Sequence, residues 1–530
     1  MTANFNKIHQ IIENSMKQNN IPGAALAIIN DHQIILSKGY GKTNVEEWGS
    51  AVLPSTLFRI ASVSKLFTGT VMMMLVEKGL IELDKRVQHY IPWFTTANQE
   101  FASMMTVRML LTHTSGLPTG DDEIYHYEKD GLFRYMKEVV PTLPVLFYPG
   151  TAYSYGNHAL NIAGFIAEQV TGKPFSAIMQ ELLFSPLQMN STTYDPLKAM
   201  TFPLALPHES AEAGDKKISH QFFDQTASYP SYYSFSSVED LCKFAMFHLQ
   251  GGQVNGHSLL LKSSIEEMRK KQSDWFTLTD GGCGITFFQE KKDGIQRFWH
   301  YGQYSSQYSS QFILVPEKGI AVIALANGEN IFQAGYEIVD ELLKEEKINS
   351  QHAVPSIQLE DVPEWEAYRG SYLHKNLGII SIDLVDEKPL ITIKNEPYEL
   401  VQYSNEIFTA NDVSGTPIHT VGFPSRPAEV PDPFLVVNTQ MCPAFIDNYE
   451  RNPLDWKEWE GVYSNGQEFF HVIIGDDSLV ITEKPSNHAF AAKAIRKNQF
   501  LFENGFVRFI NINGTIVLEF DNAWRYKKID

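Results

Sequence analysis

The stretch Phe58-Arg59-Ile60-Ala61-Ser62-Val63-Ser64-Lys65-Leu66-Phe67 places a serine and a lysine three residues apart, ahead of an apolar run. If Ser62 opens a helix, its hydroxyl and the amine of Lys65 lie on one face and can meet. The start of such a helix also brings backbone N–H donors close to the serine oxygen. A lysine beside a serine is one way to activate a hydroxyl nucleophile, and burial would favour the neutral amine that can act as a base.

The residues after Lys65 indicate the fold class. Residues 66–76 are apolar on nearly all sides, which is typical of a helix buried in a large core. This run is shorter than the roughly 20 residues that a membrane crossing needs, and Gly79 supplies a natural end for the helix. A lysine at the start of a buried helix must be paired, neutral or functional. The stretch therefore predicts a large globular core with a candidate site at its edge.

Composition points to a globular protein and excludes several kinds of partner. The 530 residues are 43% apolar and 12% aromatic, and this length fits roughly three domains. The net charge of −19 argues against nucleic acid and against an anionic membrane, since both bind basic surfaces. The cysteines Cys242, Cys283 and Cys442 form neither a zinc motif nor a disulfide framework, so no metal or other cofactor is expected. The first residues lack an apolar targeting segment, which predicts a cytoplasmic protein.

Residues 1–345 have the pattern of one α+β domain. Two apolar runs, 24–29 and 34–38, flank a turn of Asn, Asp and His and predict a β-hairpin. A second pair of strands is expected at 311–315 and 320–326, and helical patterns lie on both sides of it along the chain. Strands flanked by helices in this way predict an α+β fold.

The chain changes texture after this domain. The polar stretch 346–362 predicts a linker. The segment WEAYRGSY at 365–372 recurs as WKEWEGVY at 456–463, with the aromatic, aromatic, Gly, Tyr spacing kept over an offset of 91 residues. The repeat predicts two small all-β domains, 363–452 and 453–530, each closed as a barrel. Neither copy clusters candidate catalytic residues, so a spacer, a lid or an interface are the expected roles.

A second stretch, Tyr153-Ser154-Tyr155-Gly156-Asn157, supplies candidate partners for Ser62 and Lys65. The phenol of Tyr155 can accept or relay a proton, as a base in acylation and as an acid toward the leaving group. Asn157, two residues later, can anchor a substrate amide and hold Lys65, or it can cap the helix that follows.

A third stretch, Trp299-His300-Tyr301-Gly302-Gln303, lies between expected strands. Gly302 permits a close approach of backbones, and a strand edge here can offer an N–H to an oxyanion together with the N–H of Ser62. For His300 the alternative is a structural histidine. His113, elsewhere in the chain, fits support of a turn.

In this order and spacing, Ser62-Val63-Ser64-Lys65, Tyr155-Gly156-Asn157 and His300-Tyr301-Gly302 resemble the three motifs of the serine β-lactamase and penicillin-binding-protein superfamily. The resemblance is closest to the class C-like branch, which holds class C β-lactamases, D-aminopeptidases, alkaline D-peptidases and family VIII esterases. It covers roughly residues 5–340 and includes the segment His113-Thr114-Ser115-Gly116-Leu117.

The resemblance implies a β-lactamase-like α+β fold, in which a helical subdomain and an antiparallel sheet flanked by helices enclose the serine. The two appended barrels are similar to the three-domain layout of bacterial D-aminopeptidases. By the same analogy the acyl-enzyme forms on Ser62, and the oxyanion donors are the N–H groups of Ser62 and Gln303. Histidine rather than lysine at position 300 resembles the D-aminopeptidase and esterase members more than the β-lactamases.

The chain departs from the family pattern at two places. Residues 303–308, QYSSQY, stand where members usually carry another glycine and a small turn. Ser231-Tyr232-Tyr233 stands where members often show Ala-Gly-Gly. Both changes put bulky aromatic rings where small residues leave room, which predicts a different or narrower acyl pocket and weak β-lactam hydrolysis.

The sequence thus predicts a serine hydrolase that cleaves an amide or an ester through Ser62. The expected substrates are small molecules or short peptides, namely a D-amino-acid amide, a small D-peptide or a short-chain ester. The alternatives are a β-lactamase, a DD-peptidase-type penicillin-binding protein, or a catalytically weak penicillin-recognition or scaffold protein. A Ser-His-Asp esterase lacks support, because no serine lies in a G-x-S-x-G motif. No membrane partner is expected, and assembly into a homo-oligomer is left open.

Overall fold

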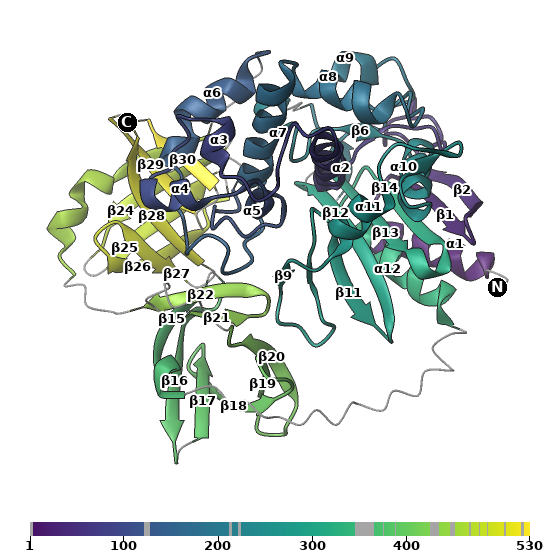
Figure 1. Ribbon diagram of the computed structural model, residues 1–530. Helices are drawn as coiled ribbons and strands as arrows, with labels where there is room; N and C mark the ends of the chain where they lie inside the picture. The colour runs from purple at the N-terminus through teal and green to yellow at the C-terminus, as the bar shows by residue number, and fades with distance from the viewer. Residues whose placement is uncertain are drawn as a thin grey trace.

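The computed structural model has an N-terminal unit of helices and strands followed by two β-barrels (Figure 1). This order confirms the predicted α+β fold with two all-β units behind it. The predicted linker, 346–362, lies outside the described residues. The structure describes residues 4–120, 128–210, 215–220, 224–344, 365–374, 376–386, 388–424, 434–445, 451–465, 468–475, 478–484, 486–502, 505–512, 514–520 and 524–529.

The N-terminal unit is built on an eight-stranded antiparallel sheet with the strand order β2-β1-β14-β13-β12-β11-β10-β9. The predicted hairpin forms one edge, and its turn residues Asp31 and His32 have φ of 49° and 57°, the left-handed pair that suits a two-residue hairpin turn. The strands are β1 Gly23–Asn30, β2 Gln33–Gly41, β9 Ser273–Asp274, β10 Gly282–Cys283, β11 Phe288–Lys292, β12 Ile295–Tyr304, β13 Tyr308–Val315 and β14 Ile320–Ala326.

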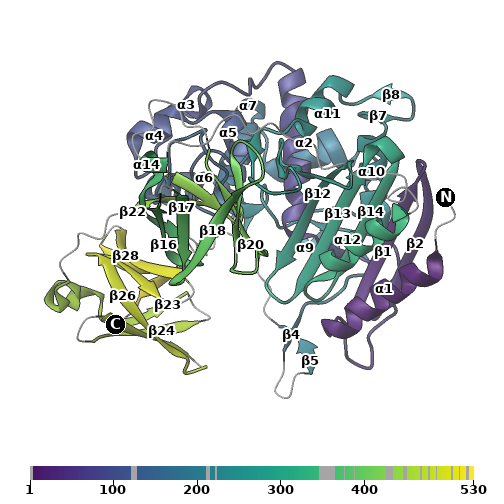
Figure 2. The same ribbon diagram turned by 90° about the horizontal axis from the view of Figure 1, so that it is seen from below.

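Helices cover both faces of this sheet, so alternate residues of its central strands enter two different cores. Ala25 and Ala27 belong to the core on the side of α2 and α10, whereas Leu26 and Ile28 belong to the core with α1 and α12 (Figure 2). The α-helices of the N-terminal unit are α1 Phe5–Gln18, α2 Ser64–Glu77, α3 Val87–Tyr90, α4 Gln99–Met104, α5 Val107–Leu111, α6 Gly131–Glu138, α7 Asn157–Thr171, α8 Phe175–Met179, α9 Pro196–Ala199, α10 Val238–Leu249, α11 Lys262–Arg269 and α12 Ile331–Leu342.

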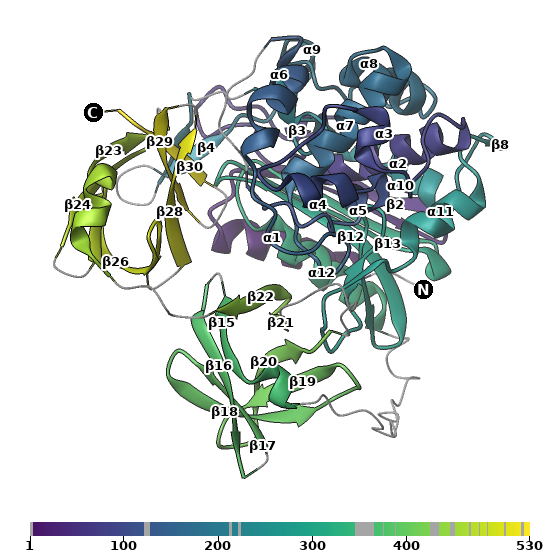
Figure 3. The same cartoon turned by 60° about the vertical axis from the view of Figure 1, so that its left-hand side comes forward.

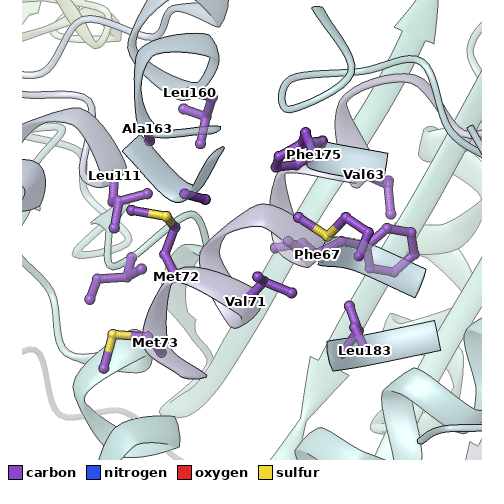
Figure 4. Packing of buried hydrophobic residues seen from close by; sticks show 14 of the residues in the cluster. Val63, Phe67, Val71, Met72, Met73, Leu111, Leu160, Ala163, Phe175 and Leu183 are labelled. Atoms are coloured by element: carbon purple, nitrogen blue, oxygen red, sulfur yellow. The ribbon is translucent and has the colours of Figure 1, made fainter. Parts of the chain in front are cut away.

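Helix α2 runs through the larger core, as its all-round apolar sequence predicts. Every residue from Ser64 to Leu75 is buried. Phe67 packs edge-on against two other rings, with centroid distances of 5.3 Å to Phe184 and 4.9 Å to Phe244. Figure 4 shows the apolar side chains of α2 directed toward α7, α8 and their neighbours. This packing anchors the helix that carries Lys65.

Three short strand pairs lie outside the main sheet. One of them joins the segment before Ser62 to the segment after Tyr233, and so holds two parts of the candidate site together. The pairs are β3 Phe58–Arg59 with β6 Phe235–Ser236, β4 His208–Ser210 with β5 Lys216–Ile218, and β7 Gln253–Val254 with β8 His257–Ser258.

The C-terminal region forms two closed eight-stranded antiparallel barrels. We call strands β15–β22 the first barrel and strands β23–β30 the second barrel. Their bounds are β15 Gly370–His374, β16 Gly378–Val385, β17 Lys388–Ile393, β18 Glu396–Gln402, β19 Ile407–Asn411, β20 Pro417–Gly422, β21 Phe434–Val437, β22 Gln440–Phe445, β23 Gly461–Ser464, β24 Phe469–Ile474, β25 Ser478–Lys484, β26 Ala489–Arg496, β27 Gln499–Phe502, β28 Gly505–Ile512, β29 Thr515–Phe520 and β30 Trp524–Lys528.

The sequence repeat corresponds to one local structure at the start of each barrel. The phenol of Tyr372 donates to the Tyr368 carbonyl at 2.6 Å, and the phenol of Tyr463 donates to the Trp459 carbonyl at 2.7 Å. The glycine two residues before each tyrosine has φ of 143° and 147°, values that favour glycine. The repeated motif therefore closes a turn that leads into the first strand of each barrel.

Both barrels contact the N-terminal unit (Figures 1 and 3). In the second barrel, Arg525 Nη1 donates to Thr142 Oγ1 at 3.2 Å. In the first barrel, the Tyr403 hydroxyl donates to the Leu278 carbonyl at 3.3 Å. Of the helices in the described part of the chain, none is both long and apolar enough to cross a membrane.

Candidate active site

Ser62 and Lys65 meet as their spacing predicts. Nζ of Lys65 donates to Ser62 Oγ at 3.0 Å, and the lysine is fully buried whereas the serine is half-buried. The expected helix start is wrong by two residues: Ser62 lies in a 3₁₀ turn, Ala61–Val63, and α2 begins at Ser64. Ala61 has φ of 45°, a left-handed value that a residue with a Cβ adopts at a cost. The serine therefore stands on a strained turn at the mouth of a buried helix.

The amine of Lys65 has two further acceptors. Asn157 Oδ1 lies 2.5 Å from Nζ, and the Ser231 carbonyl oxygen lies 2.9 Å from it. Together with Ser62 Oγ these oxygens offer one acceptor to each N–H of an ammonium group. The three oxygens belong to separate segments of the chain. The buried amine therefore links the segments of Asn157 and Ser231 to Ser62.

Asn157 serves this contact and does not cap its helix. Asn157 is the first residue of α7, and the residue at the capping position is Gly156. The side-chain oxygen of Asn157 points to Lys65. The structure thus brings Asn157 to the amine, as one of the two sequence-based alternatives predicts.

Tyr155 lies across the same amine. The centre of its ring is 4.8 Å from Lys65 Nζ. The ring also lies 4.9 Å from that of His113 and 6.1 Å from that of His300, measured between centroids. The phenol is thereby held beside Lys65 by two imidazole rings.

His113 accepts hydrogen bonds from the backbone on both sides of Tyr155. The sequence led us to expect only that it supports a turn. Its carbonyl accepts the N–H of Ser154 at 2.7 Å, and its Nδ1 accepts the N–H of Gly156 at 3.3 Å. An acceptor at Nδ1 places the proton of a neutral imidazole on Nε2. His113 has φ of 57°, so this residue too adopts a costly backbone conformation. The bonds before and after Tyr155 fix where its ring lies.

His300 is buried in strand β12, where its Nδ1 lies 2.6 Å from the Tyr301 carbonyl and its ring stacks on Phe288 at 4.3 Å. Burial, with the nearby charge of Lys65, lowers the pKa of His300 to about 3. The same two causes hold the pKa of His113 well below its usual value. Both imidazoles are therefore neutral near pH 7, and the site has no second cation from this source.

Gly302 makes the close backbone approach that its motif predicts. A Cβ on Gly302 would lie 2.3 Å from the Ile60 carbonyl oxygen and 2.9 Å from the Ser62 nitrogen, closer than side chains pack. Strand β12 therefore presses directly on the turn that carries the serine. Gln303 follows in the same strand and its side chain is exposed. The N–H groups of Ser62 and Gln303 stay the predicted oxyanion donors.

The two departures from the family pattern come together in one cluster. Tyr232 and Tyr233 stack at 4.3 Å, and Tyr304 lies 6.2 Å and 5.9 Å from them. The guanidinium of Arg59 lies 4.8 Å from the Tyr233 ring and 5.6 Å from the Tyr304 ring. The cluster adjoins Ser231, whose carbonyl accepts from the lysine. The cluster therefore begins at the residue next to the one that accepts from the amine.

Sequence reasoning missed two features of the site. The Ser231 carbonyl left no signal, because a backbone acceptor can belong to any residue type. Phe288 stacks on His300 and lies 5.8 Å from the Tyr155 ring. Its sequence context indicated a strand but gave no sign of a place in the site. In the described ranges, no three His, Cys, Asp or Glu side chains are grouped as metal ligands.

Comparisons with known proteins identify the family of the N-terminal unit. The family model described as Beta-lactamase matches residues 8–340. The chain is 28% identical over 323 residues to Penicillin-binding protein 4 of Amycolatopsis lactamdurans, covering 59% of this chain and 82% of that protein. It is 26% identical over 331 residues to Protein flp of Staphylococcus aureus strain MW2, covering 61% of this chain and 62% of that protein.

Two solved structures have a similar fold. The octameric penicillin-binding protein homologue from Pyrococcus abyssi matches with a TM-score of 0.55 and 19% identity, over 83% of this chain and 100% of that one. SurE matches with a TM-score of 0.59 and 20% identity, over 83% of this chain and 99% of that one. Both matches extend past the region of the family model, so they include part of the barrels.

Proposed function

The chain belongs to the beta-lactamase family, and from this membership we propose that it is a serine hydrolase that forms an acyl-enzyme on Ser62. The observation that supports the proposal most is the buried amine of Lys65, which is bonded to Ser62 Oγ and to Asn157 Oδ1 at the same time. Tyr155 is the third proposed catalytic residue. Asn157, His300, Gly302 and Gln303 are the proposed binding and oxyanion residues.

In the proposed acylation, Ser62 Oγ bonds to the carbonyl carbon of an amide or ester. The serine proton passes to Nζ of Lys65, 3.0 Å away, when that group is a neutral amine, or to the phenolate of Tyr155 when Lys65 is an ammonium. The carbonyl oxygen becomes an oxyanion, which the N–H groups of Ser62 and Gln303 would stabilise. The approach of Gly302 to the Ser62 nitrogen supports this pairing.

The same groups serve the rest of the proposed cycle. The proton returns from Tyr155 or Lys65 to the leaving amine or alkoxide as the C–N or C–O bond breaks. Water then attacks the acyl carbon and gives a proton to the same base, which passes it to Ser62 Oγ as the acyl C–O bond breaks, so that the acid is released and the Ser62 hydroxyl is regenerated.

We propose a D-amino-acid amide, a small D-peptide or a short-chain ester as the substrate. The aromatic cluster of Tyr232, Tyr233 and Tyr304 fills space beside Ser231, which favours a small acyl group. SurE has a solved structure with D-Leu, and it shares the fold of this chain. Histidine at position 300 agrees with the same substrate class by family resemblance.

Acylation by a β-lactam is the second candidate. It is favoured by the 28% identity to Penicillin-binding protein 4, a match that covers 82% of that protein. A stable penicillin adduct without turnover would support this candidate, or the related reading of a catalytically weak recognition protein.

A substrate panel tests the proposal. D- and L-aminoacyl p-nitroanilides, short p-nitrophenyl esters and a chromogenic cephalosporin would be offered to the wild type, to Ser62→Ala and to the control Ser103→Ala, which changes an exposed serine of α4. We expect the wild type and the control to turn over an amide or an ester, and Ser62→Ala to be inactive while keeping its melting temperature. Turnover by Ser62→Ala would refute the proposal.

A further inference from the structure

The loop between β9 and β10 reaches from the N-terminal unit toward the first barrel (Figure 1). Its consecutive residues Trp275 and Phe276 contact different parts of the molecule. The Trp275 ring lies 5.4 Å from Tyr153 and 5.1 Å from Phe288, inside the N-terminal unit. Phe276 packs instead with residues of the first barrel. One dipeptide thus joins the barrel to the side of the site.

Phe276 is held in place tightly. Its φ is 53°, a left-handed value that is rare for a bulky residue. Its N–H donates to Asp274 Oδ1 at 2.6 Å. A Cβ on Gly422, the last residue of β20, would lie 2.4 Å from Phe276 Cγ, so the ring rests directly on the barrel backbone. The contact persists only because the surrounding structure outweighs the backbone cost.

The same contact includes the segment that leads to Tyr155. Ala152 is buried in one cluster with Phe434 and Val436 of strand β21, and Phe276 packs against that cluster. Ala152 lies three residues before Tyr155 in the chain. The barrel therefore touches both the β9–β10 loop and the segment before the proposed catalytic tyrosine.

A chain of ring contacts leads from this interface to the site. Trp275 packs on Phe288, which stacks on His300 at 4.3 Å and lies 5.8 Å from Tyr155. Tyr153, the other neighbour of Trp275, lies 5.9 Å from the ring of His113. We call Trp275, Phe288 and Tyr153 the aromatic wall. Close-packed rings transmit a displacement, because few voids are present to absorb it.

We propose that Phe276 and Gly422 form a positioning contact, through which the first barrel holds the aromatic wall and hence Tyr155 in place for acylation of Ser62. This inference rests on the proposed function. Both residues act through Trp275 and Ala152, their links to the N-terminal unit. The first barrel thereby acquires a role in the rate of the reaction.

The test uses Phe276→Gly, Gly422→Ala and the double variant in the full-length chain. Phe276→Gly removes the ring and keeps φ of 53° without strain, so the loop can still form. Gly422→Ala drives a methyl group into the side chain of Phe276, but in the double variant the three atoms nearest to that methyl are absent. Val413→Ala, at a fully exposed position of the first barrel, is the control.

Two readouts are measured: the rate of Ser62 acylation by a fluorophosphonate, and hydrogen exchange of the segments 151–157 and 286–301. We expect each single variant to lower the rate by about 10-fold or more and to raise exchange in both segments. Gly422→Ala should cost little when Phe276 is already glycine, and the control Val413→Ala should keep the wild-type acylation rate and exchange.

Single variants with wild-type rate and exchange would overturn the inference, as would an equal cost of Gly422→Ala in both backgrounds. The proposed function fails in a different way, since the wild type itself would then show no adduct at Ser62. In that case hydrogen exchange of the segments 151–157 and 286–301 still measures whether the first barrel holds the aromatic wall in place.

Discussion

The amide oxygen of Asn157 lies 2.5 Å from the amine of Lys65, at the first residue of helix α7. This contact joins two helices across the buried edge of the larger core. It also helps to orient the amine, which donates to Ser62 Oγ and to the Ser231 carbonyl as well. Asn157 is therefore expected to control the proton transfer at Ser62 through its bond to Lys65.

Asn157→Asp should slow acylation by about 100-fold near pH 7. A carboxylate beside Nζ favours the ammonium form of Lys65, which cannot accept the serine proton, and it also cancels the positive charge that would stabilise a Tyr155 phenolate. The acylation rate measured between about pH 6 and 10 should recover at the alkaline end. A pH profile equal to that of the wild type would contradict the role given to Asn157.

Gly302→Ala should reduce acylation by about 100-fold, since the added methyl would lie 2.9 Å from the Ser62 nitrogen and must displace the serine turn. Stopped-flow labelling with a chromogenic ester measures the effect. Gly79→Asn is the matched control, because Gly79 has φ of 69° and nothing within 4 Å of its Cβ position, and asparagine tolerates that conformation. An alanine variant that reacts at the wild-type rate would show that β12 does not set the serine position.

Tyr304→Ala should widen the acyl specificity. Its ring packs 5.9 Å from Tyr233, and removing it opens space in the cluster beside Ser231. The ratio of kcat/KM for a phenylacetyl ester to that for an acetyl ester should rise on the order of 10-fold. Phe5→Ala, which shortens a surface ring of α1, should leave the ratio unchanged. A constant ratio in Tyr304→Ala would mean that the cluster lies outside the acyl pocket.

Stability should fall as the solution becomes acidic, because buried histidines stay neutral in the folded state. Burial holds the pKa of His248 well below its usual 6.5, so unfolding at about pH 5 takes up about one proton at this residue. The free energy of unfolding contributed by His248 is thus constant above about pH 6.5 and decreases below it.

The matched variant is His248→Gln, which changes a residue bonded to Thr70 inside the core. Urea unfolding between about pH 5 and 7.5 should give a pH slope that is smaller in this variant, by about one proton at pH 5. Equal slopes for the two proteins would show that His248 is already protonated when folded.

Features that depend on residues close together in the chain were predictable from the sequence. The buried helix α2, the hairpin turn at Asp31 and the meeting of Ser62 with Lys65 follow from periodicity, turn chemistry and helical spacing. The repeat likewise predicted two similar barrels, because the motif around Tyr372 and Tyr463 specifies one local turn.

Features that depend on distant packing were not predictable. The Ser231 carbonyl reaches the lysine across 166 residues of sequence, and any residue type could supply that oxygen. The 3₁₀ turn at Ser62 lies directly against strand β12 at Gly302, a long-range relation that helical spacing does not contain. The contact of Phe276 with Gly422 depends on how a barrel docks, and neither residue belongs to a recognisable motif.

The central claim is that Ser62 is the nucleophile, and intact-mass spectrometry after exposure to a fluorophosphonate tests it most directly. The wild type should gain the mass of one phosphonyl group, peptide mapping should place that group on Ser62, and Ser62→Ala should gain none. A wild-type protein that stays unlabelled, or a Ser62→Ala variant that is labelled to the same extent, would contradict the claim.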